Sequence, residues 1–307
     1  MQFIGALLVS LAVVTAAVEI DRTKARPIEE FDHYWAHLPT ELQALHDSRP
    51  SGRITNGREA IPGQFPYHGV LNMEFDLGIG VCGSSILSRN YILTAAHCVD
   101  GAHGGWVIVG AHDRLIAEPT QQTISFEVEG VSIHPGYTLD RIRNDIATVR
   151  LTSSMEFNDR VQPIRLPSRT DGRTFSGMLG TISGHGRTSD ASPDLSPVLR
   201  YAINPILTNA NCLEQWGNAV QYIEPQNICL SGYAGRSACN SDSGGPLTVQ
   251  DNEESLQVGV LSFGPLAGCE SGIPTVYARV TYYLDWILAN SDIEDAAVLK
   301  LTIEKDN

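Results

Sequence analysis

The 307-residue sequence predicts an all-β fold for its central part, residues 54–290. Short runs of alternating apolar residues recur there, and residues that favour turns, mainly Gly, Pro, Asn and Asp, separate them. Many short strands joined by turns are typical of a β-sandwich or β-barrel. The expected strands are residues 67–73, 82–87, 91–94, 107–110, 124–133, 147–151, 177–183, 199–206, 227–230, 246–250, 256–263 and 275–280. A helix is expected over residues 282–289, near the end of this part.

The chain begins with an apolar run from Phe3 to Val18, and Glu19 and Asp21 follow it at once. A membrane anchor, the alternative interpretation, needs about 20 consecutive apolar residues, whereas this run is shorter and ends in small residues. We therefore expect a secretory signal peptide over residues 1–17 and a secreted, extracellular protein. No later apolar run is long enough to span a bilayer, so no membrane association is expected.

The net charge of −14 argues against a nucleic-acid partner, because the chain has no strongly basic stretch to meet phosphates. The lysines are Lys24, Lys300 and Lys305, so residues 54–290 contain none. A domain without lysine would suit survival in a gut lumen rich in trypsin, although drift in composition explains the same pattern equally well.

The six cysteines all lie after residue 80, and their even number predicts disulfides in an oxidising compartment. Many pairings are open to six cysteines, and cysteine spacing alone does not select one. A zinc site is the alternative, but the chain contains no Cys-x-x-Cys pair. The cysteines are Cys82, Cys98, Cys212, Cys229, Cys239 and Cys269.

Three short segments contain residue types that fit nucleophilic catalysis. The candidate catalytic residues in them are His97, Asp145 and Ser243. A serine hydroxyl is a weak nucleophile unless a base takes its proton and a third group orients that base. Taken alone, the serine could lie in an ordinary polar turn, the aspartate on the surface and the histidine in the core. The segments are Thr94–Cys98, Asn144–Ala147 and Cys239–Pro246.

In the order His, Asp, Ser, these segments resemble the motifs of the chymotrypsin and trypsin family of serine endopeptidases, over roughly residues 54–290. The resemblance implies two six-stranded antiparallel β-barrels, with the active site between them and a short C-terminal helix. It also selects one pairing of the cysteines. The implied disulfides are Cys82–Cys98, Cys212–Cys229 and Cys239–Cys269.

The resemblance also assigns the catalytic roles. Ser243 would attack the peptide carbonyl, His97 would act as the base, and Asp145 would orient the imidazole. The backbone N–H groups of Ser241 and Ser243 would form the oxyanion hole. The implied substrates are proteins and peptides, and neither a cofactor nor a metal is expected. Calcium is not expected because Ala111 stands where trypsins have a ligand glutamate.

Residues 18–53 precede the family motifs and are expected to form an activation pro-segment. The sequence from Ser51 to Gly57 resembles the family's activation site, which implies cleavage after Arg53 by a trypsin-like protease. The freed α-amino group of Ile54 would then pair with Asp242, beside the nucleophile, and set the oxyanion hole. The uncut chain would therefore be a zymogen. Because the pro-segment has no cysteine, no disulfide would retain it after cleavage.

Two positions depart from the family pattern. Ser241 stands where the family usually has glycine, and a non-glycine residue at positive φ costs about 1–2 kcal/mol. If the peptide flips instead, one oxyanion donor is lost and turnover falls by about 10²–10³. His185 stands where the family usually has tryptophan, in a loop near the leaving-group side, where it would alter substrate preference or alter nothing.

Three residues match the primary specificity pocket of the family. Ser237 matches its base, where trypsins carry aspartate, and a neutral base argues against Arg or Lys in the substrate. Gly264 matches an open wall. Thr275 adds volume and narrows the pocket toward Leu, Met or smaller side chains, with Phe and Tyr still able to enter. The segment Phe263–Pro274 resembles arthropod chymotrypsins and the collagenolytic crustacean proteases called brachyurins.

The expected function is that of a secreted digestive serine endopeptidase with chymotrypsin-like or elastase-like specificity. One alternative is a catalytically silent or impaired homologue that acts as a binding protein, which Ser241 keeps open. Another is an immune-cascade protease, against which the neutral pocket base and the lack of a clip module argue. Expected partners are a trypsin-like activator and protein inhibitors, and the chain is expected to be a monomer. The mostly acidic tail, residues 291–307, has no assigned role.

Overall fold

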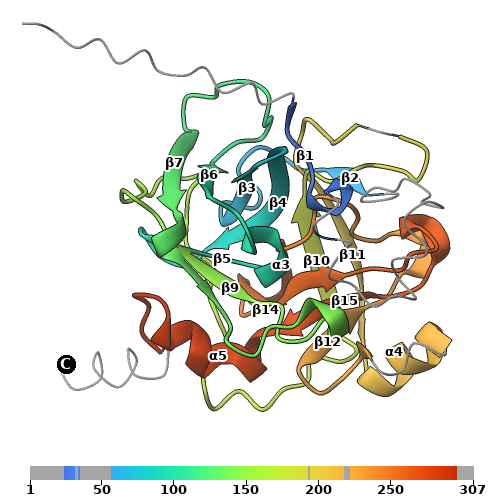
Figure 1. The fold of residues 1–307 in the computed structure, drawn as a ribbon. Coiled ribbons are helices and arrows are strands. Elements are labelled where there is room, and N and C mark those ends of the chain that lie inside the picture. The colour runs from blue at the N-terminus through green and yellow to red at the C-terminus, as the bar shows by residue number, and fades with distance from the viewer. Residues whose placement is uncertain (1–23, 32–33, 35–56, 193, 218–221, 296–307) are drawn as a thin grey trace, which may run out of the picture.

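The fold is described from a computed structural model, for residues 24–31, 34, 57–192, 194–217 and 222–295. The predicted signal peptide, the predicted cleavage site between Arg53 and Ile54, and tail residues 296–307 lie outside these residues. Two β-sheets lie next to each other and make up most of the described chain (Figure 1).

The first sheet is an antiparallel, barrel-like sheet of seven strand segments, two of which are halves of one strand. Its strands are β3 (His68–Phe75), β4 (Gly78–Ile86), β5 (Tyr91–Thr94), β6 (Gly104–Val109), β7 (Gln122–Glu127), β8 (Val131–Ile133) and β9 (Ala147–Arg150). They pair in the order β7-β6-β3-β4-β5-β9-β8. β7 and β8 are the two halves of the strand predicted at residues 124–133, and a 3-10 helix at Val128–Gly130 interrupts it. A Cβ on Gly130 would lie 2.5 Å from the carbonyl oxygen of Arg150, so glycine allows the close approach that completes the barrel.

The second sheet closes into a six-stranded antiparallel barrel. Its strands are β10 (Leu179–Gly184), β11 (Arg200–Leu207), β12 (Asn227–Leu230), β13 (Pro246–Asp251), β14 (Glu254–Phe263) and β15 (Thr275–Arg279). They pair in the order β10-β13-β14-β15-β12-β11, and β10 pairs with β11 to close the ring. The short β2 (Arg58–Glu59) adds to β11. The predicted fold class, two six-stranded antiparallel barrels with a C-terminal helix, is confirmed.

The α-helices connect or cover the barrels. They are α3 (Ala96–Val99), α4 (Asn209–Trp216) and α5 (Val280–Ala289), with further 3-10 helices at Leu139–Arg141, Tyr233–Gly235 and Cys269–Ser271. α5 is the predicted C-terminal helix. α4 was not predicted; the hydroxyl of Thr208 caps it by accepting a hydrogen bond from the N–H of Asn211 at 3.1 Å. Within the described residues, no helix has the length and apolar character needed to cross a membrane.

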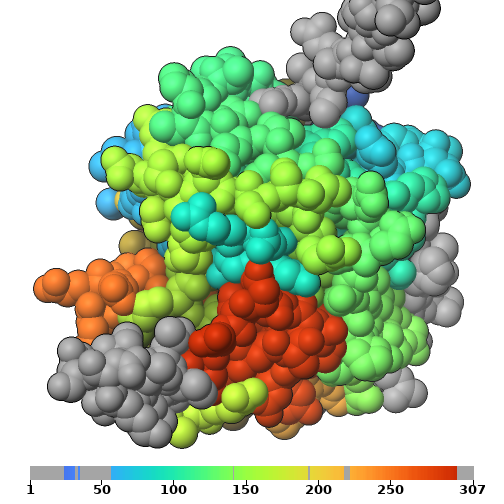
Figure 2. Space-filling view, turned by 90° about the vertical axis from the view of Figure 1, so that its left-hand side faces the viewer, coloured from blue at the N-terminus to red at the C-terminus, as the bar shows by residue number. Residues whose placement is uncertain are grey.

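α5 follows the last strand of the second barrel, yet it packs on the first. Its buried side chains Val280, Tyr283 and Ile287 belong to the same hydrophobic core as Leu71 and Val107 of the first barrel. In Figure 2 the C-terminal residues, drawn in red, lie directly against residues drawn in teal and green. The two barrels are therefore joined by a shared element as well as by their contact.

A segment near the N-terminus lies on the first barrel. β1 (Arg26–Pro27) pairs in parallel with β4, opposite Gly80 and Val81. A 3-10 helix at Ile28–Glu30 follows, and Phe31 is its C-cap. The side chains of Ile28 and Phe31 are buried in the first-barrel core. Figure 1 shows this segment, in blue, beside β4.

The structure contains three disulfides, with the pairing that the family resemblance implies. They are Cys82–Cys98, Cys212–Cys229 and Cys239–Cys269. The first joins β4 to α3, the second joins α4 to β12, and the third ties the segment before Ser243 to a 3-10 helix. The sulfur atoms of the first disulfide lie within 4.8 Å of a ring nitrogen of His97. Because both sulfurs are in the disulfide, they do not offer thiolate ligands to a metal.

Candidate active site

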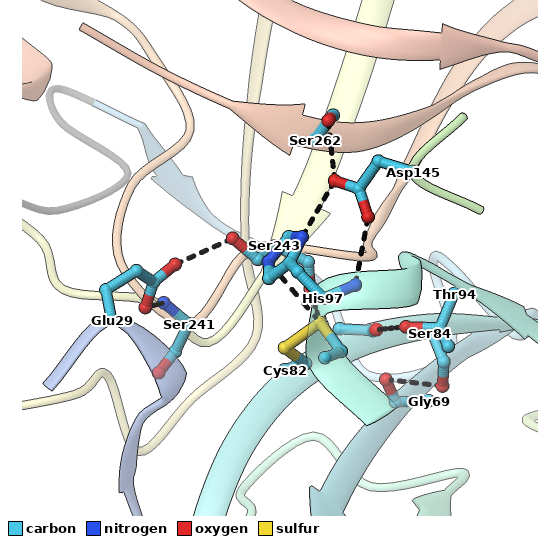
Figure 3. Close-up of a disulfide and its surroundings, with 12 residues drawn as sticks. Glu29, Gly69, Cys82, Ser84, Thr94, His97, Asp145, Ser241, Ser243 and Ser262 are labelled. Atoms are coloured by element: carbon cyan, nitrogen blue, oxygen red, sulfur yellow. Dashed lines mark hydrogen bonds and ion pairs between the residues drawn. A yellow bond between two sulfur atoms is a disulfide. The ribbon is translucent and has the colours of Figure 1, made fainter. Parts of the chain in front are cut away.

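His97, Asp145 and Ser243 come together at the junction of the two barrels (Figure 3). His97 lies on α3, just after β5, and Asp145 lies just before β9, whereas Ser243 precedes β13 of the second barrel. Asp145 Oδ2 accepts a hydrogen bond from His97 Nδ1 at 2.8 Å, and Oδ1 accepts one from the backbone N–H of His97 at 2.9 Å. The carboxylate thus orients the imidazole and leaves Nε2 as its proton acceptor.

Ser262, near the end of β14, holds Asp145 from the second barrel. Its Oγ donates a hydrogen bond to Asp145 Oδ2 at 2.6 Å, and both side chains are buried. A hydrogen bond to a buried carboxylate replaces the stabilisation that water would give it. Nothing in the sequence around Ser262 indicates this contact, because a serine at the end of an apolar strand has no distinctive motif.

The surroundings of His97 act on its pKa in opposite directions. Burial lowers the pKa of the imidazole, whereas the Asp145 carboxylate raises it through its charge and its hydrogen bond. Glu29 and Asp100 raise it further, and the resulting pKa lies above the ordinary value for histidine. This environment favours the imidazolium form, which a general base must reach when it accepts a proton.

The hydroxyl of Ser243 is directed at a carboxylate from the N-terminal segment. Ser243 Oγ donates a hydrogen bond to Glu29 Oε1 at 2.7 Å (Figure 3). The backbone N–H of Ser241 donates to the other oxygen, Oε2, at 3.4 Å. In the described part of the chain, the contact of His97 Nε2 is with Cys98 Sγ, at 3.7 Å, rather than with the Ser243 hydroxyl. Glu29 was missed in the sequence, where it is one acid among several in a polar stretch.

Ser241 adopts the strained backbone conformation that its position in the family pattern suggested. Its φ is +72°, in the left-handed region that favours glycine. In this conformation its N–H points at Glu29 Oε2 and is not flipped away from the catalytic centre. Its own Oγ is buried and has no hydrogen-bond partner among the described residues. The side chain therefore brings strain without a compensating contact there.

The turn around Ser243 depends on the glycine that follows it. Gly244 has a φ of +78°, and a Cβ there would lie 2.2 Å from Thr94 Oγ1 in the first barrel. The backbone carbonyl of Ser243 accepts a hydrogen bond from the N–H of Gly83 at 2.8 Å. These contacts hold the turn against the first barrel, the barrel that carries His97.

Asp242, next to Ser243, is buried, and backbone N–H groups bind its carboxylate. Oδ1 accepts a hydrogen bond from the N–H of Gly186 at 2.8 Å, and Oδ2 accepts one from the N–H of Cys239 at 2.9 Å. Burial outweighs these hydrogen bonds and raises the pKa of Asp242 to about 8. Its predicted partner, the α-amino group of Ile54, lies outside the described residues.

Two of the predicted pocket residues, Ser237 and Thr275, are buried, whereas Gly264 is exposed. A Cβ on Gly264 would lie 3.5 Å from Thr275 Cγ2, which is ordinary contact distance. Thr275 Oγ1 is hydrogen-bonded to the hydroxyl of Tyr277 at 3.0 Å, which fixes its orientation. Ser237 Oγ donates to the backbone carbonyl of Ala238 at 3.2 Å. The structure thus brings Gly264 and Thr275 together, and Ser237 makes its hydrogen bond within its own segment.

His185, which replaces the usual tryptophan, is a buried residue directly after β10. Its ring packs against the ring of His68, with 5.9 Å between centroids. Burial, with His68 and Arg114 nearby, lowers its pKa well below the ordinary value. His185 is therefore a neutral side chain in the protein interior.

Comparisons with known proteins agree with this geometry. The model of the family described as Trypsin matches residues 54–287. Brachyurin from Leptuca pugilator is 38% identical over 240 residues, which cover 78% of this chain and 99% of that protein. Chymotrypsin from Phaedon cochleariae is 36% identical over 246 residues, which cover 79% of this chain and 84% of that protein. A solved structure of HL collagenase has 34% identity and a TM-score of 0.70, and covers 78% of this chain and 99% of that one.

Proposed function

Because the chain belongs to the trypsin family and is a serine endopeptidase, we propose that Ser243, His97 and Asp145 carry out its peptide-bond hydrolysis. The observation that carries this proposal is the buried hydrogen bond between His97 Nδ1 and Asp145 Oδ2, beside a serine held in a glycine turn. A base that is oriented in this way can activate the hydroxyl, which is otherwise a weak nucleophile.

The reaction proceeds in two steps, formation of an acyl-enzyme and its hydrolysis. Ser243 Oγ attacks the carbonyl carbon while its proton passes to His97 Nε2, and Asp145 stabilises the imidazolium that forms. The negative oxygen of the tetrahedral intermediate accepts hydrogen bonds from the N–H groups of Ser241 and Ser243. When the C–N bond breaks, the imidazolium returns its proton to the leaving amine. Water then attacks the acyl-enzyme with His97 as base again, which releases the acid and restores the Ser243 hydroxyl.

The chain is proposed to be a secreted zymogen that a trypsin-like protease cuts after Arg53. Asp242 supports this proposal because burial raises its pKa to about 8, so this carboxyl would be stabilised by a nearby cation. The freed α-amino group of Ile54 would be that cation. Since Asp242 lies between Ser241 and Ser243 in the chain, the ion pair would act directly on both oxyanion donors.

Cleavage is proposed to follow apolar residues of medium size. A neutral Ser237 at the pocket base would leave an Arg or Lys side chain without a counter-charge. Thr275, whose Cγ2 would lie 3.5 Å from a Cβ on Gly264, reduces the room for a large ring, which favours Leu and Met over Phe and Tyr. Because similar proteins bear the names chymotrypsin and collagenase, both apolar peptides and collagen belong among the substrates to be assayed.

A digestive role in an extracellular space, such as a gut lumen, is proposed for a monomeric enzyme. The acidic composition and the lysine-free domain support it, since trypsin would share that space and cuts after lysine. The proposed partners are the activating protease, dietary protein and protein inhibitors of serine proteases.

The decisive assay compares the precursor with the cut protein. The purified chain is treated with trypsin, Ile54 is confirmed as the new N-terminus, and the released peptide is removed by size exclusion. Turnover is then measured on peptides that end in Leu, Met, Phe, Ala or Arg, with Ser243→Ala alongside. We expect turnover on Leu and Met peptides that depends on cleavage and disappears in the variant. A correctly cut protein that is silent on every peptide and resists a fluorophosphonate would contradict the proposal and favour the silent homologue.

A further inference from the structure

The catalytic centre is covered by residues 24–31 together with Tyr34, here called the inhibitory segment. Ser243 is only 6% exposed and His97 only 3%. Glu29 contacts the hydroxyl of Ser243, and the ring of Tyr34 lies 5.4 Å from the ring of His97, measured between centroids. The nucleophile and the base are thus each covered by a different side chain of the same segment.

The carboxylate of Glu29 contacts the two groups that a substrate carbonyl needs. One oxygen accepts the hydroxyl proton of Ser243 in a hydrogen bond, and the other accepts the N–H of Ser241 (Figure 3). A carboxylate is negatively charged, as the oxyanion of the intermediate is, so it suits donors that are arranged for that charge. It has no leaving group and is a poor electrophile, so Ser243 cannot cleave the segment there.

Apolar contacts anchor the segment on both sides of Glu29. Ile28 is fully buried, and Phe31 lies 5.3 Å from the ring of Phe75 between centroids. The guanidinium of Arg26 lies 4.5 Å from the centre of the Phe31 ring. Burying two large apolar side chains removes apolar surface from water and so stabilises the segment in this position. The main-chain pairing of β1 with β4 adds to this anchoring.

A charged contact fixes the residue next to Glu29. Glu30 forms an ion pair with Arg187, whose side chain is largely buried. An Arg–carboxylate pair that is shielded from water is stronger than an exposed one. The two neighbouring glutamates therefore have separate partners. Glu29 binds Ser243 and Ser241, and Glu30 binds Arg187, which follows β10.

We infer that the inhibitory segment is a built-in inhibitor of the protease, which blocks Ser243 through the carboxylate of Glu29. This inference rests on the proposed function of the same site. It differs from activation through Ile54 because it acts by occupying a formed site, so it can persist after Arg53 has been cut. The peptide that cleavage frees is a competitive inhibitor whose release, and not the cut alone, sets the onset of activity.

The sequence of the pro-segment fits such a persistent inhibitor. Between Lys24 and the cleavage site, the basic residues are Arg26 and Arg49, and a proline follows each of them. Proline after the scissile bond impedes trypsin-like cleavage, because its ring fixes φ and removes the N–H. The activating protease therefore leaves the part that carries Glu29 and Tyr34 intact. No disulfide links this part to the enzyme, so dilution releases it.

The test uses the full chain, cut with immobilised trypsin and not separated from its pro-segment. Wild type, Glu29→Ala, Glu29→Gln and the control Glu129→Gln, an exposed acid, are each cut, and Ile54 is confirmed as the N-terminus. Turnover is measured over a series of protein dilutions and compared with the mature domain isolated from each variant. Because all samples have the free Ile54, differences among them report the segment and not the activation step.

We expect cut wild type and cut Glu129→Gln to be inhibited at high protein concentration and to recover on dilution, with a raised apparent KM and an unchanged kcat. Glu29→Ala should weaken the inhibition by about tenfold to a hundredfold, the range for a lost hydrogen bond to a charged group. Glu29→Gln, which removes only the negative charge, should also weaken the inhibition. Cut wild type that equals the mature domain at every dilution, or Glu29→Ala that behaves like wild type, would overturn the inference alone. An isolated mature domain without turnover would overturn the proposed function as well.

Discussion

The hydroxyl of Ser262 in the second barrel donates a 2.6 Å hydrogen bond to the carboxylate of Asp145 in the first. Asp145 in turn holds His97, so the orientation of the imidazole depends on a residue of the opposite barrel. A small shift of one barrel relative to the other would therefore move the base away from Ser243.

Replacing Ser262 with alanine removes one hydrogen bond from a buried carboxylate. We expect kcat/KM to fall by about tenfold or more, because a hydrogen bond to a charged group is worth about 1.5–3 kcal/mol. The exposed Ser153→Ala serves as the control and should leave kcat/KM unchanged. Circular dichroism would show that the fold is retained. Full activity in Ser262→Ala would mean that Asp145 is held well enough by His97 alone.

Removing the charge of Glu29 should lower the pKa of His97 in the uncut chain. Glu29 is one of the carboxylates that raise this pKa, so Glu29→Gln leaves the imidazolium less stabilised. The titration of His97, followed by NMR of its ring protons, should therefore move to lower pH. In the control variant Glu129→Gln, His97 should titrate as it does in wild type. A titration that does not move would show that Glu29 lies farther from the imidazole in solution.

Asp242 should make the uncut chain less stable as the pH rises. Burial raises its pKa in the folded chain to about 8, far above its value in the unfolded chain. The contribution to stability is thus complete below the unfolded pKa and is lost as the pH rises toward 8. Asp242→Asn should flatten the fall in the free energy of unfolding between pH 4 and pH 8, measured by urea denaturation. Parallel curves for the two proteins would contradict this assignment.

Glycine at position 241 should stabilise the mature protein. Ser241 has a φ of +72°, and relief of that strain is worth about 1 kcal/mol. For a domain of this size, the expected rise in Tm is about 2–4 °C. Ser241→Ala retains the strained φ and should show no such rise, since the lost hydroxyl has no hydrogen-bond partner among the described residues. Both variants keep the N–H and should keep turnover.

Enlarging the pocket should shift specificity toward large rings. Thr275→Gly removes the side chain that faces Gly264, and we expect kcat/KM on Phe peptides to rise by about tenfold relative to Leu peptides. Thr275→Val keeps the volume but loses the hydrogen bond to Tyr277, so it separates size from polarity. If Thr275→Val shifts kcat/KM toward Phe peptides as much as Thr275→Gly does, the preference depends on the hydrogen bond to Tyr277 and not on the size of the side chain.

The sequence was sufficient for the parts of the fold that depend on local pattern. The alternation of apolar residues located the barrel strands, and a compact apolar run located α5. The break between β7 and β8 was missed because it depends on how close Gly130 lies to Arg150 in space. α4 was missed because polar residues interrupt its eight-residue sequence, which therefore forms no long apolar run.

Some residues of the candidate site could likewise be found from the sequence, and others only from the structure. The residues in short motifs, His97, Asp145 and Ser243, could be found from sequence, and the structure brings them together. Glu29 and Ser262 could not, because each contacts its partner over more than a hundred residues of sequence, at separations of 214 and 117. Such contacts depend on how whole barrels pack, so no motif in the neighbouring sequence predicts them.

The position of α5 governs the order in which the protein can fold during synthesis. Val280, Tyr283 and Ile287 complete the core of a barrel whose strands end at Arg150, and the Tyr283 hydroxyl reaches Asn144, 139 residues earlier. A nascent chain that has emerged only as far as the first barrel therefore carries an unfilled core and exposed apolar surface. Contacts between such distant parts of the sequence also slow folding. We therefore expect the first barrel to become stable only after the last helix has been synthesised.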